Sequence, residues 1–345
     1  MAFTVTVKPR SSKPSKRFPL TLQLDSTEPT VGDLKRAIAA KAKLDVNRQR
    51  ITTIDKKQAL ENDDAALIQL GVNDGDQLEI KDLGPQIAWK TVPPTNAPMV
   101  SNQFGPLFIH PLFYYGSKLI YRQDFEHSKM QKWVSRPLYK LDELEAVCRD
   151  KRQRGLTDSV CHRIALVLIL LHYAKRELET LFVHRFSSAT MPFFNIFKNS
   201  GHYWGLSGVL LAAPLYGPWN GAKALTGSHI ETDAWLYGWT ALWTFAELSN
   251  LKTHLTLASL RPRGTKVRQV PKGYGFNTVS CGNYFFESIA WVAFTGLTLN
   301  WAAALFTAVA VGQMYVWAVK KHRRYRKEFG DKYPRGRKAM FPFIA

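Results

Sequence analysis

A polar stripe, Asn250, His254 and Arg261, interrupts an otherwise apolar part of this sequence. These residues are separated by four and seven positions, so on a helix of 3.6 residues per turn they point within about 40° of one another. Pro262 disfavours helix at Arg261, and further basic residues follow it. Amide, imidazole and guanidinium donors beside such cations suit a pyrophosphate or a ribose 2′-phosphate. A site for lipid headgroups fits the same spacing, and the residues leave both open.

Three other groups of polar residues lie beside apolar segments. They are Asn283, Tyr284 and Glu287; Tyr173, Lys175, Arg176 and Glu177; and the run from Lys321 to Arg326, which contains Arg323 and Tyr325. Tyrosine and basic residues at helix ends are ordinary interfacial anchors of membrane proteins, so the last group alone indicates no site. A carboxylate in lipid is costly, and we therefore expect Glu287 to face the interior of a helical bundle in a paired or functional role.

Charge divides the chain of 345 residues into two parts. Lys and Arg number 47 against 27 Asp and Glu, a net charge of +20, and almost all of this excess lies after residue 84. Residues 91–117 and 288–319 contain no charged side chain, and about 20 apolar residues are needed to cross a bilayer core. We expect a multi-domain protein with a soluble cytosolic domain at 1–84 and an all-α membrane domain at 85–345.

The first 84 residues predict a small α+β domain. Hydrophobic residues alternate at Phe3–Val7 and at Leu20–Leu24, and a helical period begins at Val31 with Thr30 or Asp33 as its cap. A closing strand follows at Gln77–Ile80. This order of elements resembles the ubiquitin-like fold.

The rest of the chain predicts a polytopic bundle of about six transmembrane helices. The candidate segments are residues 99–118, 160–181, 202–219, 234–249 and 284–319. The last segment is too long for one crossing, and a break near Asn300 would divide it into two helices. Lys and Arg dominate the loops at 251–283 and 320–338, which predicts cytosolic N- and C-termini, although the mixed charge of 117–163 conflicts with that orientation.

Several kinds of site are excluded or disfavoured. Cys148, Cys161 and Cys281 are odd in number and scattered, which supports neither a disulfide framework nor a metal site. The basic residues adjoin predicted spans and no nucleic-acid-binding fold is recognisable, so nucleic acid is a poor partner. No G-x-G-x-x-G follows a strand, and any dinucleotide must therefore be held by membrane helices and their loops.

Four ordered segments resemble the very-long-chain trans-2-enoyl-CoA reductases, whose C-terminal part belongs to the steroid 5α-reductase superfamily. These segments are residues 172–199, 250–264, 279–287 and 321–329, followed by the terminal FPFIA. The resemblance implies a cofactor region at about 172–345 in a multi-pass enzyme of the endoplasmic reticulum membrane, surrounded by membrane lipid and other fatty-acid elongation enzymes. It implies NADPH-dependent reduction of very-long-chain trans-2-enoyl-CoA to saturated acyl-CoA, the last step of the elongation cycle, which also feeds sphingolipid synthesis.

The resemblance also implies roles for particular residues. Catalytic positions are matched by Tyr173, which faces the substrate carbonyl in the superfamily, and by Lys175 and Tyr284. Cofactor-binding positions are matched by Arg176, Asn250, His254, Arg261, Asn283, Glu287, Arg323 and Tyr325. One departure concerns the family's Glu-Tyr pair before a Gly-Pro. Here Asn102-Gln103-Phe104 stand in its place, so a carboxylate that would support the acid tyrosine is missing.

Reduction of an enoyl thioester needs a hydride donor and an acid. Hydride adds to the β-carbon, negative charge develops on the carbonyl oxygen, and a neutral hydroxyl group must meet that charge. Tyrosine, with a reference pKa of about 10, supplies such a hydroxyl at neutral pH, and a nearby Lys eases its transient ionisation. We therefore expect Tyr173 or Tyr284 to be the acid, tuned by Lys175.

Three alternatives stay open. A steroid or polyprenol reductase would keep the hydride transfer but act on an enone or an allylic lipid. A methyltransferase of the isoprenylcysteine type would hold a nucleotide-like cofactor in comparable helices. A non-catalytic membrane scaffold would use its first domain to recruit partners, and the absence of stabilisation by NADPH would favour it.

Overall fold

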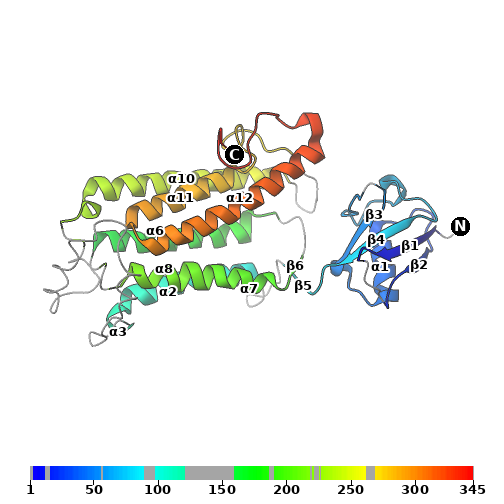
Figure 1. Ribbon diagram of the computed structural model, residues 1–345, viewed down its shortest axis with the longest axis horizontal. Coiled ribbons are helices and arrows are strands. Elements are labelled where there is room, and N and C mark those ends of the chain that lie inside the picture. The colour runs from blue at the N-terminus through cyan, green and yellow to red at the C-terminus, as the bar shows by residue number, and fades with distance from the viewer. Residues whose placement is uncertain are drawn as a thin grey trace. The chain divides into compact units, whose positions relative to one another are not determined.

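The computed structural model describes residues 3–11, 16–55, 57–88, 98–120, 159–185, 190–217, 220, 225, 227–261 and 269–344. The chain divides into two compact units, Met1–Ala97 with Phe186–Asn195 and Pro98–Arg185 with Ile196–Ala345 (Figure 1). The boundary expected after residue 84 falls inside the first unit. There, β5 (Gln86–Ala88) continues the chain and pairs antiparallel with β6 (Thr190–Pro192).

The first unit contains a four-stranded mixed sheet packed on one helix. Its elements are β1 (Phe3–Pro9), β2 (Leu20–Leu24), α1 (Val31–Ala42), β3 (Gln49–Thr53) and β4 (Gln77–Asp82), with the short 3₁₀ helices η1 (Val46–Arg48) and η2 (Ile68–Leu70) between them. The strand order is β2-β1-β4-β3, with β1 and β4 parallel and the other pairs antiparallel. This confirms the small α+β domain that the alternating residues predict.

Helix α1 begins with a reciprocal cap. The Thr30 hydroxyl accepts from Asp33 N at 3.2 Å, and the Asp33 carboxylate accepts from Thr30 N at 2.9 Å. The buried face of α1, which includes Val31, Leu34 and Ile38, packs into the core of the sheet. Thr30 is therefore the cap residue, and the helical period of the sequence marks the core face.

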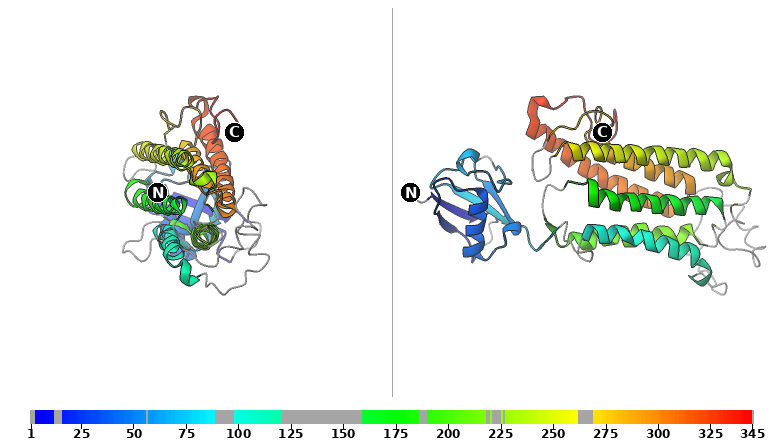
Figure 2. Two further views of the ribbon diagram at one scale, coloured as in Figure 1. Left: turned by 90° about the vertical axis from the view of Figure 1, so that its left-hand side faces the viewer. Right: turned by 180° about the vertical axis from the view of Figure 1, so that it is seen from behind.

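The second unit is helical. Its elements are α2 (Pro98–Tyr115), α3 (Ser117–Ile120), α6 (Val160–Leu178), η3 (Glu179–Val183), α7 (Asn195–Ser200), η4 (Gly201–Leu210), α8 (Leu211–Leu215), η6 (His229–Glu231), α10 (Asp233–Ser259), α11 (Gly282–Thr298), α12 (Trp301–Phe329) and η7 (Gly330–Lys332). The long helices run side by side in Figure 1 and in the reverse view of Figure 2, and the end-on view of Figure 2 shows them as a bundle. A large hydrophobic core, with Trp243, Trp291 and Phe306 among its aromatic members, holds the bundle together.

Two features of the bundle matter for the site. First, η3 and η4 are π-helical, a conformation that is rare and often occurs at functional sites. Second, α11 and α12 are separate helices. Leu299 has a positive φ of 42°, and the Asn300 side chain caps α12 by accepting from Ala302 N at 2.8 Å. The predicted break near Asn300 is confirmed, and its cause is this cap.

Within the described ranges, one segment is long and apolar enough to cross a membrane, Trp301–Lys332. By contrast, charged side chains lie within α6, which contains Lys175 and Arg176, and within α10, which contains Glu247. The mostly helical character of the second unit is confirmed, and the six crossings stay a prediction.

Candidate functional site

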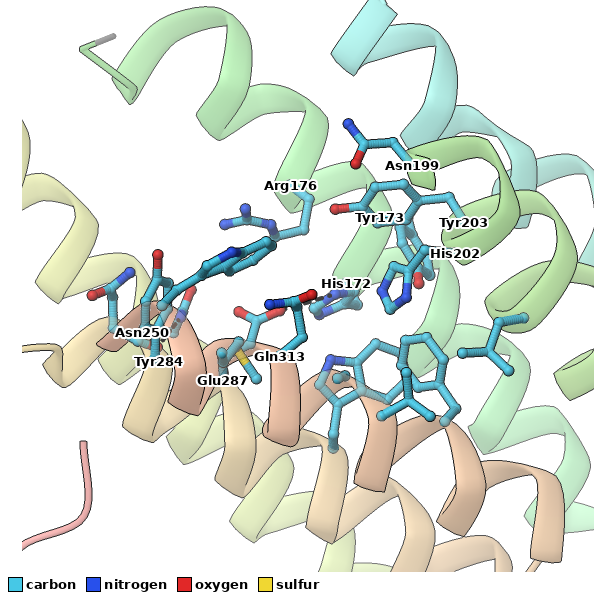
Figure 3. A pocket seen from close by; sticks show the side chains of 18 of the residues that line it. His172, Tyr173, Arg176, Asn199, His202, Tyr203, Asn250, Tyr284, Glu287 and Gln313 are labelled. Atoms are coloured by element: carbon cyan, nitrogen blue, oxygen red, sulfur yellow. Dashed lines mark hydrogen bonds and ion pairs between the residues drawn. The ribbon is translucent and has the colours of Figure 1, made fainter. Parts of the chain in front are cut away.

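A cavity of about 380 Å³ lies in the second unit among α6, α7, η4, α10, α11 and α12 (Figure 3). Its polar lining comprises His172, Tyr173, Arg176, Lys198, Asn199, His202, Tyr203, Asn250, His254, Asn283, Tyr284, Glu287 and Gln313. Its apolar lining includes Leu206, Trp291, Phe306, Val309, Ala310, Met314 and Trp317. The cavity has the size of a small-molecule site, and its mixed wall can hold a polar group beside a hydrocarbon chain.

Glu247 of α10 is a buried carboxylate that contacts two side chains of α6. It accepts a hydrogen bond from His172 Nδ1 at 2.7 Å and forms an ion pair with Lys175 Nζ at 2.6 Å. His172 Nε2 lies 3.5 Å from Glu287 Oε1, which brings α11 into the same network. Buried charges are costly unless they are paired, and this pairing aligns the polar faces of three helices.

A second chain of contacts runs from Lys175 to the start of α11. Lys175 Nζ donates to Asn250 Oδ1 at 2.6 Å, and Asn250 Nδ2 donates to the carbonyl oxygen of Asn283 at 2.9 Å. The side-chain Oδ1 of Asn283 is buried at the cavity and has no hydrogen-bond partner among the described residues. Because an unpaired buried acceptor is unfavourable, this atom is suited to receive a donor from a ligand.

Arg176 lies at the cavity wall between a carboxylate and two imidazoles. Its Nη1 donates to Glu179 Oε2 at 2.7 Å and to His254 Nε2 at 3.2 Å. Since His254 Nε2 accepts, its Nδ1 carries the proton and donates to His184 Nε2 at 3.1 Å. Glu179, His184 and His254 could also ligate a metal, because their ligand atoms lie within 4.8 Å of one another. The guanidinium already contacts two of the three, so the arrangement favours an anionic ligand over a cation.

The two candidate acid tyrosines occupy different parts of the lining. Tyr173 is 1% exposed, and its hydroxyl is hydrogen bonded to Ser207 Oγ of η4. Tyr284 is half-buried on α11, with Lys321 Nζ 5.4 Å from the centre of its ring. Within the described ranges, Lys175 has neither an ion pair nor a hydrogen bond with either tyrosine. Its contacts make it a positioning residue for Glu247 and Asn250.

Gln103 of α2 stands where the resemblance leads us to expect a carboxylate. Its side chain is fully buried, its Nε2 donates to Tyr203 Oη at 3.4 Å, and its Oε1 accepts from Thr180 Oγ1 at 3.5 Å. None of these hydrogen bonds reaches Tyr173. The side chain of Asn102 lies outside the described residues.

Three residues expected to bind the cofactor do not line this cavity. Arg261 lies beyond the end of α10, and its Nη1 donates to the carbonyl oxygen of Arg185 at 2.8 Å. Arg323 is exposed on α12. Tyr325 is buried against Phe329 and Tyr333, with ring centres 5.9 and 6.0 Å away. The other five expected cofactor residues, and both tyrosines, line the cavity.

Sequence reasoning missed several residues of the site. The most consequential are His172 and Glu247, together with Ser207, which contacts Tyr173. Glu247 carried a usable signal, because a carboxylate inside an apolar segment is costly and marks a paired or functional position. Ser207 carried no such signal, since a serine in an apolar helix is common and its contact depends on the π-helical turn of η4.

The chain is similar to a known protein family, to two reductases and to a solved ubiquitin structure. Residues 189–345 match the family described as 3-oxo-5-alpha-steroid 4-dehydrogenase. A Schizosaccharomyces pombe protein that is named as an enoyl reductase is 40% identical over 341 residues, which are 99% of each chain. The very-long-chain enoyl-CoA reductase of Dictyostelium discoideum is 38% identical over 92% of this chain and 93% of its own. Among solved structures, a Caldiarchaeum subterraneum ubiquitin is 28% identical, with a TM-score of 0.21, over 27% of this chain and 98% of its own.

Proposed function

This chain belongs to the family of very-long-chain enoyl-CoA reductases, oxidoreductases that act on a CH–CH bond, and we propose that it reduces very-long-chain trans-2-enoyl-CoA with NADPH. The observation that carries this proposal is the cavity, which is lined by the Asn283 acceptor of α11 and by the Arg176 guanidinium and the Tyr173 ring of α6. The proposed cofactor-binding residues and the candidate acid tyrosine therefore line the same cavity.

The lining residues fit a nicotinamide dinucleotide. Asn283 Oδ1 is a buried acceptor without a partner among the described residues and can receive a carboxamide N–H. Arg176 and Lys198 supply cationic donors for phosphate oxygens. NADPH, when bound, supplies the hydride. The apolar wall formed by α12, with Val309 and Trp317, suits the acyl chain of the substrate.

The chain's own residues have separable tasks in this reaction. Tyr173, whose side chain is 1% exposed, would hold a proton and donate it to the enolate. Tyr284 is the other candidate for this task. Glu247 orients His172 and Lys175, and Lys175 in turn orients Asn250, so the polar wall is set before the ligands bind.

Activity with a defined acceptor tests the proposal. The purified full-length chain is expected to oxidise NADPH with a long trans-2-enoyl-CoA and to yield the saturated acyl-CoA. Tyr173→Phe is expected to lower kcat by about a hundredfold to a thousandfold if Tyr173 is the acid. Tyr237→Phe is the matched control, because Tyr237 is a 67% exposed tyrosine of α10 outside the cavity lining. Wild-type turnover in Tyr173→Phe and loss of turnover in Tyr284→Phe would transfer the role to Tyr284.

The same experiment addresses the alternatives. Turnover of an enone steroid or polyprenal in place of the thioester would favour the steroid and polyprenol branch of the superfamily. Methyl transfer without NADPH oxidation would favour the methyltransferase alternative.

We place this activity in the endoplasmic reticulum membrane, with about six crossings and both termini cytosolic. The apolar part of Trp301–Lys332 and the basic residues at 320–338 support this location. There the chain would act as the last enzyme of fatty-acid elongation beside the other elongation enzymes and supply acyl chains for sphingolipids. Proteolysis of sealed vesicles would show on which side each terminus lies.

A further inference from the structure

The hydroxyl group of Tyr173 is held by another hydroxyl group. Within the described part of the chain, Ser207 Oγ is its hydrogen-bond partner. Tyr173 is 1% exposed and Ser207 is 0% exposed, so water does not compete for this contact. The ring of Tyr173 is fixed as well, since it lies edge-on to His172 at 4.9 Å. The phenol therefore has one defined orientation.

Ser207 is itself fixed from the side of α2. Its carbonyl oxygen accepts from His110 Nε2 at 2.9 Å, and His110 Nδ1 lies 3.1 Å from Tyr216 Oη. Because Nε2 must donate to a carbonyl, His110 is protonated there and its Nδ1 accepts from Tyr216. The next residue is Gly208, where an added Cβ would lie 2.6 Å from Ile109 Cδ1. Gly208 thus packs closely against Ile109 of α2 beside Ser207.

A carboxylate is absent at the place where the family resemblance predicts support for the acid tyrosine. Gln103, in that segment, hydrogen bonds to Tyr203 and Thr180. A hydroxyl group can both donate and accept, whereas an ionised carboxylate only accepts. The serine can therefore stabilise the tyrosine before and after the tyrosine loses its proton.

We propose that Ser207 is the positioning residue that replaces the missing carboxylate and aims the Tyr173 hydroxyl at the substrate carbonyl. The inference rests on the proposed function. In the step it supports, the O–H bond of Tyr173 breaks, the proton goes to the enolate oxygen, and the electron pair stays on the phenolate oxygen. The enol that results tautomerises to the saturated thioester. Ser207 keeps its own proton and donates a hydrogen bond to the phenolate. A proton from solution reaches the Tyr173 phenolate through the cavity after the product leaves, so that each turnover consumes one proton.

A double-mutant cycle tests this role in the full-length protein. Ser207→Ala is expected to lower kcat by about tenfold to a hundredfold with little change in KM, because the lost interaction strengthens only as charge develops. Ser207→Thr keeps the hydroxyl and is expected to recover most of the rate. In the Tyr173→Phe background, Ser207→Ala is expected to change the rate by less than about twofold, because the partner hydroxyl is already gone.

Three results would overturn the proposal. They are a Ser207→Ala variant as fast as wild type, an equal loss of rate in the Tyr173→Phe background, and a Ser207→Thr variant as slow as Ser207→Ala although both unfold at the wild-type temperature. The acceptor panel separates this proposal from the proposed function. If the chain reduces an enone instead of an enoyl-CoA, the proposed function fails and the cycle is measured with the enone. If no acceptor in the panel supports NADPH oxidation, both proposals fail.

Discussion

The two units of this protein use charge in different ways. In the first, Arg48 Nη2 and Asp82 Oδ2 pair at 2.6 Å with 33% and 42% of their side chains exposed. In the second, Lys175 and Glu247 pair at the same separation with 18% and 6% exposed. An exposed pair contributes about 0–1 kcal/mol, whereas removing one partner of a buried pair costs about 3–5 kcal/mol. The Arg48–Asp82 pair is thus peripheral to the first fold, whereas the Lys175–Glu247 pair is buried behind the cavity lining of the second unit and contacts His172 and Asn250 there.

The largest expected effect comes from the buried pair. Glu247→Ala removes the shared partner of His172 and Lys175 and is expected to lower the free energy of unfolding by about 3–5 kcal/mol and to abolish turnover. Glu247→Gln keeps the shape and the acceptor for His172, so its loss of stability should be smaller. Thermal unfolding of the detergent-solubilised chain measures both, with Asp82→Asn as the control for an exposed pair. If Glu247→Ala unfolds at the wild-type temperature, the buried pair does not stabilise its unit more than the exposed pair does.

The next effect concerns the unpaired acceptor of the polar wall. Asn283→Ala is expected to weaken NADPH binding by about tenfold to a hundredfold, because one hydrogen bond in a buried site is lost. The measurement is a titration of NADPH against intrinsic fluorescence, independent of turnover. Asn73→Ala, at an exposed position of the first unit, is the matched control. An unchanged affinity would remove Asn283 from the cofactor site.

A smaller effect is expected from the cap of α1. Thr30→Ala removes the hydroxyl that accepts from Asp33 N, and such a loss costs about 1 kcal/mol. Hydrogen exchange of the α1 amides in the full-length protein should rise, while NADPH oxidation should stay unchanged because no residue of α1 lines the cavity. If protection of α1 is unaffected, the tertiary packing of α1 holds the helix without its cap.

The smallest effect is the pH dependence of the exposed pair. The hydrogen bond from Arg48 holds the pKa of Asp82 below its ordinary value of 3.8. Because this pKa is lowered by folding, the stabilisation is present above about pH 4 and is lost as the pH falls through the folded-state pKa. Because both side chains are partly exposed, the pair contributes less than about 1 kcal/mol to stability. Amide exchange of β3 and β4 at neutral pH should be only slightly faster in Asp82→Asn than in wild type, and the two should converge at low pH. A large difference at neutral pH would mean that the pair is more than peripheral.

Local patterns in the sequence were sufficient for β1, β2, α1 and β4 of the first unit, but not for its pairing of β5 with β6. The alternation at Phe3–Val7 and the cap at Thr30 depend on neighbours along the chain, and the structure has both. The break before α12 was also predictable, since an uncharged segment of that length exceeds one crossing and Asn300 is a good cap.

The candidate site was only partly accessible to the same reasoning. Helical spacing gives the direction of a side chain but not its position along the axis. Arg261 follows Asn250 by eleven residues, which is about 16 Å of rise, and α10 ends at Ser259, so the two do not share a wall. Glu247 was overlooked because it was read as part of an apolar segment. The contact of Ser207 with Tyr173 joins residues that are far apart in sequence, and no periodicity indicates it.

The pairing of β5 with β6 makes the first unit discontinuous in sequence. β6 lies in Phe186–Asn195, far downstream of the rest of that unit. A deletion of everything before residue 98 would therefore leave Thr190–Pro192 as an orphan strand whose backbone groups are available to other chains. Nor could the unit of another protein be grafted in as one uninterrupted piece. Any exchange would have to carry both stretches of the chain together.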